Sequence, residues 1–265
     1  MTDERRFTEF ELRSMNEVWV ENNEDFVFDH TKIVLLQNNE FFSAATTERL
    51  LHHRENPDCS KLDYVVLIPR EDYCPRYKPH LTKAPARLPS NTYIKRPSLL
   101  PWDRNTPDSN IAGLVLHEAE ICEILRKNPH PNIVAYHGCQ VVDGRVVGLC
   151  LTRYDATLAE RLATTTVIPI QSWYEGMKRG VDHLHHIGLV HNDFNPSNIM
   201  FDGDTPVIID FDSCKQIGEE LGDKAGTHGW DLEHANIALP ENDTFGLRRI
   251  KDTLLSKIEA QKEKI

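Results

Sequence analysis

The chain has 265 residues, of which 40% are hydrophobic and 27% charged, which predicts a folded protein of one large domain or two small ones. Its longest apolar run extends only from Tyr64 to Ile68, and its first residues are strongly charged, so we expect neither a membrane span nor a secretory signal. Acidic residues outnumber basic ones by 41 to 30, a net charge of −11, and such a field disfavours a nucleic acid partner.

The N-terminal part of the sequence combines short apolar runs with a proline-rich stretch. Residues 1–25 are charged and show a weak helical tendency around Met15. The short, β-branched runs Lys32–Leu36 and Tyr64–Ile68 predict strands. The many prolines of residues 69–107 predict mostly loop, interrupted by one short strand at Asn91–Arg96.

Helical and strand patterns are clearer in the rest of the chain. A helix is predicted from Ser109, a suitable N-cap, to Lys127, and a second over Gln171–His186, ended by Gly188. The other predicted elements are strands at residues 133–139, 146–152, 199–202 and 206–211 and a helix at residues 243–265. This order of elements predicts an α+β protein with two lobes.

One carboxylate lies on an apolar helix face. Glu118 shares the face of the first predicted helix with Leu114, Ile121 and Leu125, and a carboxylate there needs a buried partner. Glu120 and Glu123 lie off this face, so we expect them to need no buried partner.

The sharpest motif is the segment His191-Asn-Asp-Phe-Asn-Pro-Ser-Asn198, followed twelve residues after Asn198 by Asp210-Phe-Asp212. Aspartate, asparagine and proline are also common in ordinary turns, so a lone H-x-D would mean little. Here seven positions follow one another in the order of a known pattern: His191, Asp193, Pro196, Asn198, Ile199, Asp210 and Phe211.

This segment resembles the catalytic loop and the metal-binding loop of the protein kinase family, whose patterns are H-R-D-x-x-x-x-N and D-F-G. The resemblance implies that Asp193 is the catalytic residue that orients the acceptor hydroxyl. It also implies that Asn198 and Asp210, both with hard oxygen ligands, hold Mg²⁺ against the phosphates of ATP.

The resemblance extends upstream and downstream of this motif. Tyr93-Ile-Lys-Arg96 looks like the V-A-I-K strand, which implies that Lys95 contacts the ATP phosphates and pairs with Glu118. Read alone, Lys95 is simply a solvated lysine beside prolines. Three further blocks resemble the hinge that holds the adenine, the end of the activation segment and the helix that supports the catalytic loop: Thr152-Arg153-Tyr154, Gly226-Thr-His-Gly-Trp230 and Asp243-Thr-Phe-Gly246.

The family resemblance, which covers about residues 93–255, implies a truncated and atypical two-lobed protein kinase-like fold. Residues 1–60 would be an N-terminal extension or extra N-lobe elements, residues 61–152 a small β-rich N-lobe, and residues 153–265 a shortened helical C-lobe. The first glycine of the sequence is Gly113, so a glycine-rich phosphate loop before Lys95 is excluded.

The implied function is ATP- and Mg²⁺-dependent phosphoryl transfer to a Ser/Thr hydroxyl of a protein substrate, with neither a nucleic acid nor a membrane as partner. Three residues depart from the pattern: Asn192 replaces an arginine, Asn195 a lysine and Asp212 a glycine. Because Asn195 and Asp212 also suit aminoglycoside and choline kinase-like enzymes, a small-molecule kinase stays open as an alternative. A pseudokinase that binds ATP without turnover is the other.

Overall fold

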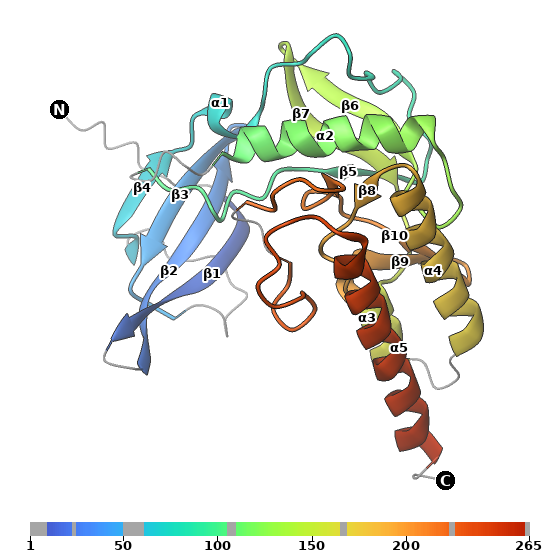
Figure 1. The fold of residues 1–265 in the computed structure, drawn as a ribbon. Coiled ribbons are helices and arrows are strands. Elements are labelled where there is room, and N and C mark those ends of the chain that lie inside the picture. The colour runs from blue at the N-terminus through green and yellow to red at the C-terminus, as the bar shows by residue number, and fades with distance from the viewer. Residues whose placement is uncertain are drawn as a thin grey trace, which may run out of the picture. The chain divides into compact units, whose positions relative to one another are not determined.

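The computed structural model divides into two compact units, which consist of residues 1–76 with 97–113 and residues 77–96 with 114–265 (Figure 1). The residues it describes are 10–22, 25–49, 61–104, 110–164, 169–222 and 226–262. Ser109, the expected helix N-cap, lies outside these residues.

The first unit is built on a four-stranded antiparallel sheet in the order β1-β2-β3-β4, followed by one turn of helix. Its elements are β1 (Glu11–Asn22), β2 (Asp25–Gln37), β3 (Glu40–Thr46), β4 (Tyr64–Leu67) and α1 (Arg70–Tyr73). The predicted helical tendency around Met15 is wrong, because this residue pairs with Ile33 across the β1–β2 ladder. Pairing with a neighbouring strand overrides a weak local preference.

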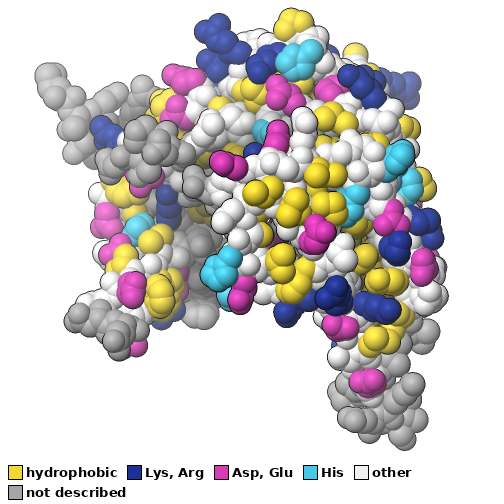
Figure 2. Space-filling model, viewed as in Figure 1, with side chains coloured by type: hydrophobic (Ala, Val, Ile, Leu, Met, Phe, Trp, Pro, Cys, Tyr) yellow, Lys and Arg dark blue, Asp and Glu magenta, His cyan; other side chains and the backbone are white. Residues whose placement is uncertain are grey.

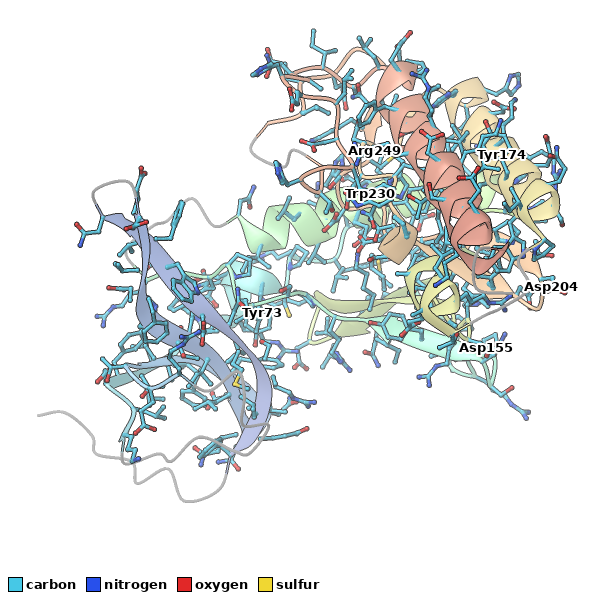
Figure 3. The ribbon with its side chains drawn as sticks, turned by 90° about the horizontal axis from the view of Figure 1, so that it is seen from below. Tyr73, Asp155, Tyr174, Asp204, Trp230 and Arg249 are labelled. Atoms are coloured by element: carbon cyan, nitrogen blue, oxygen red, sulfur yellow. The ribbon has the colours of Figure 1, made fainter. Side chains whose placement is uncertain are left out.

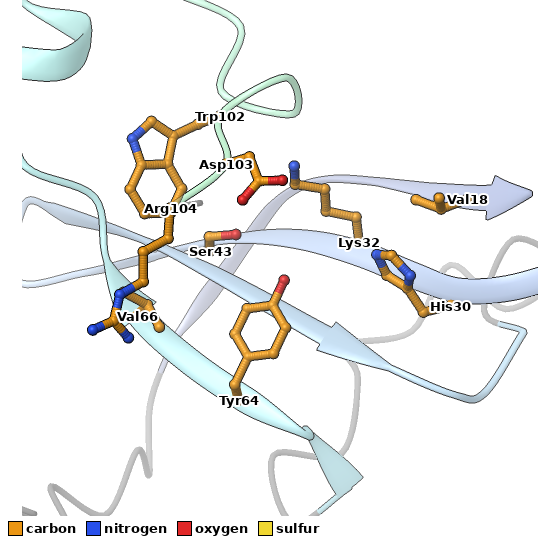
Figure 4. Close-up of a pocket in the computed structure, with 9 residues that line it drawn as sticks. All are labelled: Val18, His30, Lys32, Ser43, Tyr64, Val66, Trp102, Asp103 and Arg104. Carbon is orange, nitrogen blue, oxygen red and sulfur yellow. The ribbon is translucent and has the colours of Figure 1, made fainter. Parts of the chain in front are cut away.

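The two faces of this sheet have different environments. Ile33, Leu35, Phe42 and Ala44 form a buried apolar cluster on one face. Because side chains alternate along a strand, their neighbours in sequence lie on the other face. There a pocket of about 600 Å³ is lined by Val18, His30, Lys32, Ser43, Tyr64, Val66, Trp102, Asp103 and Arg104 (Figure 4). Burial lowers the pKa of Lys32, and the charge of Asp103 partly offsets this.

The second unit begins with a three-stranded antiparallel sheet in the order β5-β7-β6 and the helix α2. Its strands are β5 (Thr92–Lys95), β6 (Tyr136–Val142) and β7 (Arg145–Thr152), and α2 (Ile111–Lys127) belongs to this unit from Leu114 onward. The short strand expected at 91–96, the helix expected up to Lys127 and the two strands after it are all present. Buried residues of α2, β6 and β7 share one apolar cluster.

Among its described residues, the remainder of the second unit contains three α-helices and two small sheets. They are α3 (Leu158–Thr164), α4 (Ile170–His186), α5 (Pro240–Lys262), the hairpin β9 (Ile199–Asp202) with β10 (Thr205–Ile208), and β8 (Leu189–Val190) with β11 (Lys215–Gln216). The strand predicted at 206–211 ends early, because Asp210 has a left-handed φ of 63° that no strand accommodates.

Helix α4 forms as its sequence pattern predicts. Its predicted apolar face, Trp173, Met177, Val181 and Leu184, is buried, and Gly188 follows the helix with a φ of 82°.

No helix among the described residues is long and apolar enough to cross a membrane. On the face shown in Figure 2, acidic and basic side chains are interspersed.

Helix α5 approaches the polypeptide backbone of the segment after Asp193 very closely at Gly246. A Cβ atom there would overlap the carbonyl oxygen of Phe194 and lie 3.0 Å from the Phe194 Cβ. Glycine normally destabilises a helix relative to alanine, by about 1 kcal/mol, so this contact is the reason for the glycine.

We therefore predict that Gly246→Ala lowers the free energy of unfolding by about 1–3 kcal/mol, the usual scale of overpacking, although alanine is the better helix former. Urea unfolding measures this change. The matched control is Asp252→Ala, at an exposed position of the same helix, which should stay within about 0.5 kcal/mol of the wild type. Equal or greater stability of Gly246→Ala would show that the close approach is wrong.

Candidate functional site

Lys95 connects three elements that are far apart in the sequence. Its Nζ lies 2.6 Å from Glu118 Oε1 and 2.7 Å from Asp210 Oδ1. Lys95 is the last residue of β5, Glu118 lies in α2, and Asp210 follows β10 by two residues. Glu118 Oε1 also accepts a hydrogen bond of 3.2 Å from the backbone N–H of Phe211, which attaches α2 to the loop after β10.

Burial and charge act in opposite directions on this cluster. Burial alone would lower the pKa of Lys95, but the carboxylates of Glu118, Asp210 and Asp212 raise it above its ordinary value. Burial raises the pKa of Glu118, and the charge of Lys95 opposes this. The lysine is therefore a stable cation at neutral pH, held by carboxylates on two sides.

The sequence prediction that a glutamate off the apolar face needs no buried partner holds for Glu120 but not for Glu123. Glu120 is exposed and contacts Lys78 and His80 at 3.2 and 3.3 Å, as expected for a residue off the apolar face. The prediction that Glu123 needs no buried partner is wrong, because its carboxylate is buried and accepts two hydrogen bonds from Thr82. Sequence periodicity missed this contact because residues 77–89 cover that side of the helix.

The Asp193 carboxylate accepts four hydrogen bonds. Its Oδ1 accepts from Asn195 Nδ2 at 3.0 Å and from the backbone and hydroxyl of Thr227 at 2.8 and 2.7 Å. Its Oδ2 accepts from Asn198 Nδ2 at 2.7 Å. Burial would raise the pKa of Asp193, but the hydrogen bonds from Thr227 and Asn195 and the nearby His191 lower it below its ordinary value. The group is therefore anionic at neutral pH.

Asp243, at the start of α5, fixes the backbone that carries Asp193. Its carboxylate is fully buried and accepts hydrogen bonds from the N–H of His191 at 2.9 Å and of Asn192 at 2.8 Å. His185 Nε2 donates to the same carboxylate at 2.9 Å. A buried carboxylate is costly unless such donors surround it, so Asp243 and the loop hold each other in place.

Asn198 and Asp210 flank the open end of the β9–β10 hairpin. The ladder closes with Ile199 opposite Ile208, and the Ile209 N–H then donates to the Asn198 carbonyl at 2.9 Å. This bond brings the backbones of the two predicted metal ligands together. Asn198 uses its amide nitrogen to hold Asp193, which leaves its side-chain oxygen as an acceptor.

A pocket of about 460 Å³ lies next to Lys95 and Asp210. Apolar side chains line much of it, and the predicted hinge residues Thr152, Arg153 and Tyr154 line it as well. The Thr152 hydroxyl is hydrogen-bonded to His137 Nε2 at 3.0 Å, and the Arg153 N–H donates to the Asn91 carbonyl at 2.6 Å. The other predicted site residues, Glu118, Asp193 and Asn198, do not line this pocket. Glu118 contacts the lining residue Lys95, and Asn198, which holds Asp193, accepts a backbone hydrogen bond from the lining residue Ile209.

The contact between Thr227 and Asp193 is not predictable from the sequence of the segment Gly226–Trp230. In the structure Trp230 N–H donates to the Thr227 carbonyl at 2.8 Å, and the Arg249 guanidinium lies 5.8 Å from the Trp230 ring centre (Figure 3). These contacts attach the segment to α5 and explain how Thr227 reaches the carboxylate. A lone threonine carries no signal for such a long-range contact.

Three curated protein kinases are similar to part of this chain. Serine/threonine-protein kinase/endoribonuclease IRE1 of Hypocrea jecorina (strain QM6a) is 29% identical over 130 residues, 41% of this chain and 10% of that protein. MAP kinase kinase kinase SSK2 of Saccharomyces cerevisiae (strain ATCC 204508 / S288c) is 30% identical over 134 residues, 48% of this chain and 8% of that protein. MAPK/MAK/MRK overlapping kinase of Mus musculus is 32% identical over 105 residues, 37% of this chain and 24% of that protein.

The chain thus spans a quarter or less of the length of these curated relatives. Among solved structures, it is similar to the yeast RNA Pol II CTD kinase CTDK-1 complex, with a TM-score of 0.46 and 20% identity over 51% of this chain and 48% of that one. The family match is to the protein kinase domain, over residues 104–231. The segment that matches this family model includes Glu118, Asp193, Asn198 and Asp210.

Proposed function

We propose that this protein binds ATP with Mg²⁺ and transfers the γ-phosphoryl group to a serine or threonine hydroxyl of a protein substrate. The observation that carries the proposal is the placement of Lys95 between Glu118 and Asp210, at one pocket, in a unit whose Asp193 is held by four hydrogen bonds. A protein that only binds nucleotide has no chemical need of the second arrangement.

The residues at the site fit both ATP and Mg²⁺. The apolar lining, with Leu151, Met200 and Ile209, suits the adenine base, and the Lys95 ammonium suits phosphate oxygens. Asp210 and Asn198 offer a carboxylate and an amide oxygen, which are ligands that Mg²⁺ prefers. Among the described residues no three His, Cys, Asp or Glu side chains gather as a metal site, so phosphate oxygens would complete the coordination. A bound Mg²⁺ would neutralise charge on the phosphates.

Asp193 would act on the acceptor. Because its pKa is lowered, the carboxylate is anionic at neutral pH and can accept a hydrogen bond from the acceptor hydroxyl. The hydroxyl oxygen forms the new bond to the γ-phosphorus, the bond to the bridging oxygen of ADP breaks, and the hydroxyl proton passes to Asp193. Lys95 would hold the α- and β-phosphates while this charge develops on ADP.

Two neighbouring residues bear on the acceptor class. Asn195, which supplies an amide where the family pattern has a lysine, also caps the turn Pro196–Asn198 through Ser197 N–H at 2.8 Å. An amide at this position favours the small-molecule kinase alternative. The two hydrogen bonds from Thr227 to Asp193 favour a protein acceptor, because they build the segment around Gly226–Trp230 into the site.

The ion pair gives the first functional prediction. Lys95→Met should weaken ATP binding about 10-fold or more, the scale of a lost charged hydrogen bond of about 1.5–3 kcal/mol. Glu118→Gln should lower turnover more than ATP affinity, because the cation remains but is held on one side only. The control is Glu120→Gln, on the same helix, which removes only exposed contacts. Calorimetric ATP titration and steady-state kinetics check these changes, and a larger effect of Glu120→Gln would contradict the assignment.

The second functional prediction concerns the class of molecule that accepts the phosphoryl group. The protein is incubated with radiolabelled ATP and Mg²⁺, together with a generic protein acceptor or a panel of aminoglycosides and choline. We expect label on serine and threonine of the protein acceptor, absent in Asp193→Asn. Transfer to the small molecules alone would establish the alternative. Binding of ATP without transfer to any acceptor would support the pseudokinase.

A further inference from the structure

Residues 77–89, which we call the strap, pass along one edge of the sheet that contains β6. The Tyr77 N–H donates to the Gly144 carbonyl at 2.9 Å. Further along, the Cys139 N–H donates to the Thr82 carbonyl at 2.7 Å, and the Ala84 N–H donates to the Cys139 carbonyl at 2.9 Å. The strap is therefore fixed to β6 by two backbone hydrogen bonds, one from the N–H of Cys139 and one to its carbonyl.

The strap also holds helix α2 through a buried carboxylate. Glu123 accepts hydrogen bonds from the Thr82 N–H at 2.6 Å and from the Thr82 hydroxyl at 2.9 Å, and it lies 3.3 Å from Arg126 Nε. Its residue is 6% exposed, so these bonds are shielded from water. Breaking a hydrogen bond to a buried charge is costly, so among the described residues this is a stronger polar attachment between strap and helix than the exposed ion pairs.

Glu123 and Glu118 leave α2 on different sides. Five residues separate them, which is about 140° around the helix axis. One carboxylate therefore meets Lys95 and the other meets Thr82, so the helix is held from two directions. A rotation or shift that freed Glu123 would also move Glu118 relative to the lysine.

Gly138 allows the strap to come this close. It has a φ of 121°, and an added Cβ would lie 2.6 Å from the Ala84 nitrogen, 2.7 Å from the Lys83 carbonyl carbon and 2.9 Å from the Ala84 Cα. These neighbours are backbone atoms and cannot turn aside as a flexible side chain can. Any larger residue at this position would push the strap away from β6.

Among the described residues, the other ion pairs between strap and helix are on the surface. Glu120 meets Lys78 and His80, and all three side chains are at least 41% exposed. Exposed ion pairs contribute little to stability because water and salt screen them. Glu120 is therefore a matched control for Glu123: same helix, same strap, but no burial.

We propose that the strap positions helix α2, with Thr82 and Glu123 as positioning residues that keep Glu118 in contact with Lys95. The expected effect on turnover rests on the proposed function, whereas the expected effect on the chemical labelling of Lys95 does not. The strap thus controls how often Glu118 and Lys95 are in contact, although the strap itself contacts no nucleotide.

The test is the rate at which an amine-reactive reagent modifies Lys95 in the full chain, measured by mass spectrometry. Lys178, an exposed lysine paired with Asp182, serves as the internal reference. Gly138→Ala displaces the strap and Thr82→Val removes one donor at nearly the same volume. Each should raise the labelling of Lys95 by a factor of about 3 or more, because an ammonium group held by one carboxylate instead of two reaches solvent more often. Glu120→Gln should leave the labelling unchanged.

A second set of variants distinguishes an effect of the strap through Glu118 from a general loss of structure around Lys95. Glu118→Gln should itself raise the labelling of Lys95, and Thr82→Val in that background should add no further increase if it acts through Glu118. Independent, multiplicative increases would overturn the inference, as would unchanged labelling in Thr82→Val when that variant is folded by circular dichroism. Wild-type protein that transfers no phosphate would remove the proposed function but leave this labelling result standing.

Discussion

The second unit depends on one partly buried cation. Lys95 lies between Glu118 and Asp210, so the end of β5, the middle of α2 and the loop after β10 meet at a single ammonium group. Desolvating these charges is costly, and their mutual attraction offsets the cost only while all three are in place. Replacing Lys95 would leave the buried Glu118 carboxylate without its cation, and replacing Glu118 would leave Lys95 held by Asp210 alone, so a single substitution here is expected to affect the position of α2.

A second polar cluster, around Asp193 and Asp243, is tied to the first by the β9–β10 hairpin. His191 Nε2 donates to the Ile209 carbonyl at 3.0 Å, and the Ile209 N–H donates to the Asn198 carbonyl. Ile209 thus connects the loop that carries Asp193 with Asp210. Under the proposed function, the first cluster would hold the phosphates and the second would orient the acceptor, which are the two tasks of phosphoryl transfer.

Local pattern predicted much of this unit and missed what depends on long-range contact. Helical phase was sufficient to choose Glu118 over Glu120 and to identify the buried face of α4. It failed at Met15, where pairing with β2 decides the structure, and at Glu123, which a distant segment covers. Thr227 was missed for the same reason, since no pattern within a threonine's own neighbourhood indicates that it donates to Asp193. Residues whose role shows in their own local pattern, such as Glu118, could be predicted; Glu123 and Thr227, whose role depends on a distant segment alone, could not.

The central claim is that Asp210 joins Lys95 to metal-bound ATP, and thermal unfolding with ATP, with and without Mg²⁺, measures it most directly. A ligand at 100 times its Kd stabilises by about 2.7 kcal/mol, so the shift is readily detected. We expect a Mg²⁺-dependent rise in Tm for the wild type and for Asp193→Asn, whose carboxylate faces the acceptor, and loss of the Mg²⁺-dependent part in Asp210→Asn. An equal Mg²⁺-dependent rise in Asp210→Asn, or none in the wild type at millimolar ATP, would contradict the account.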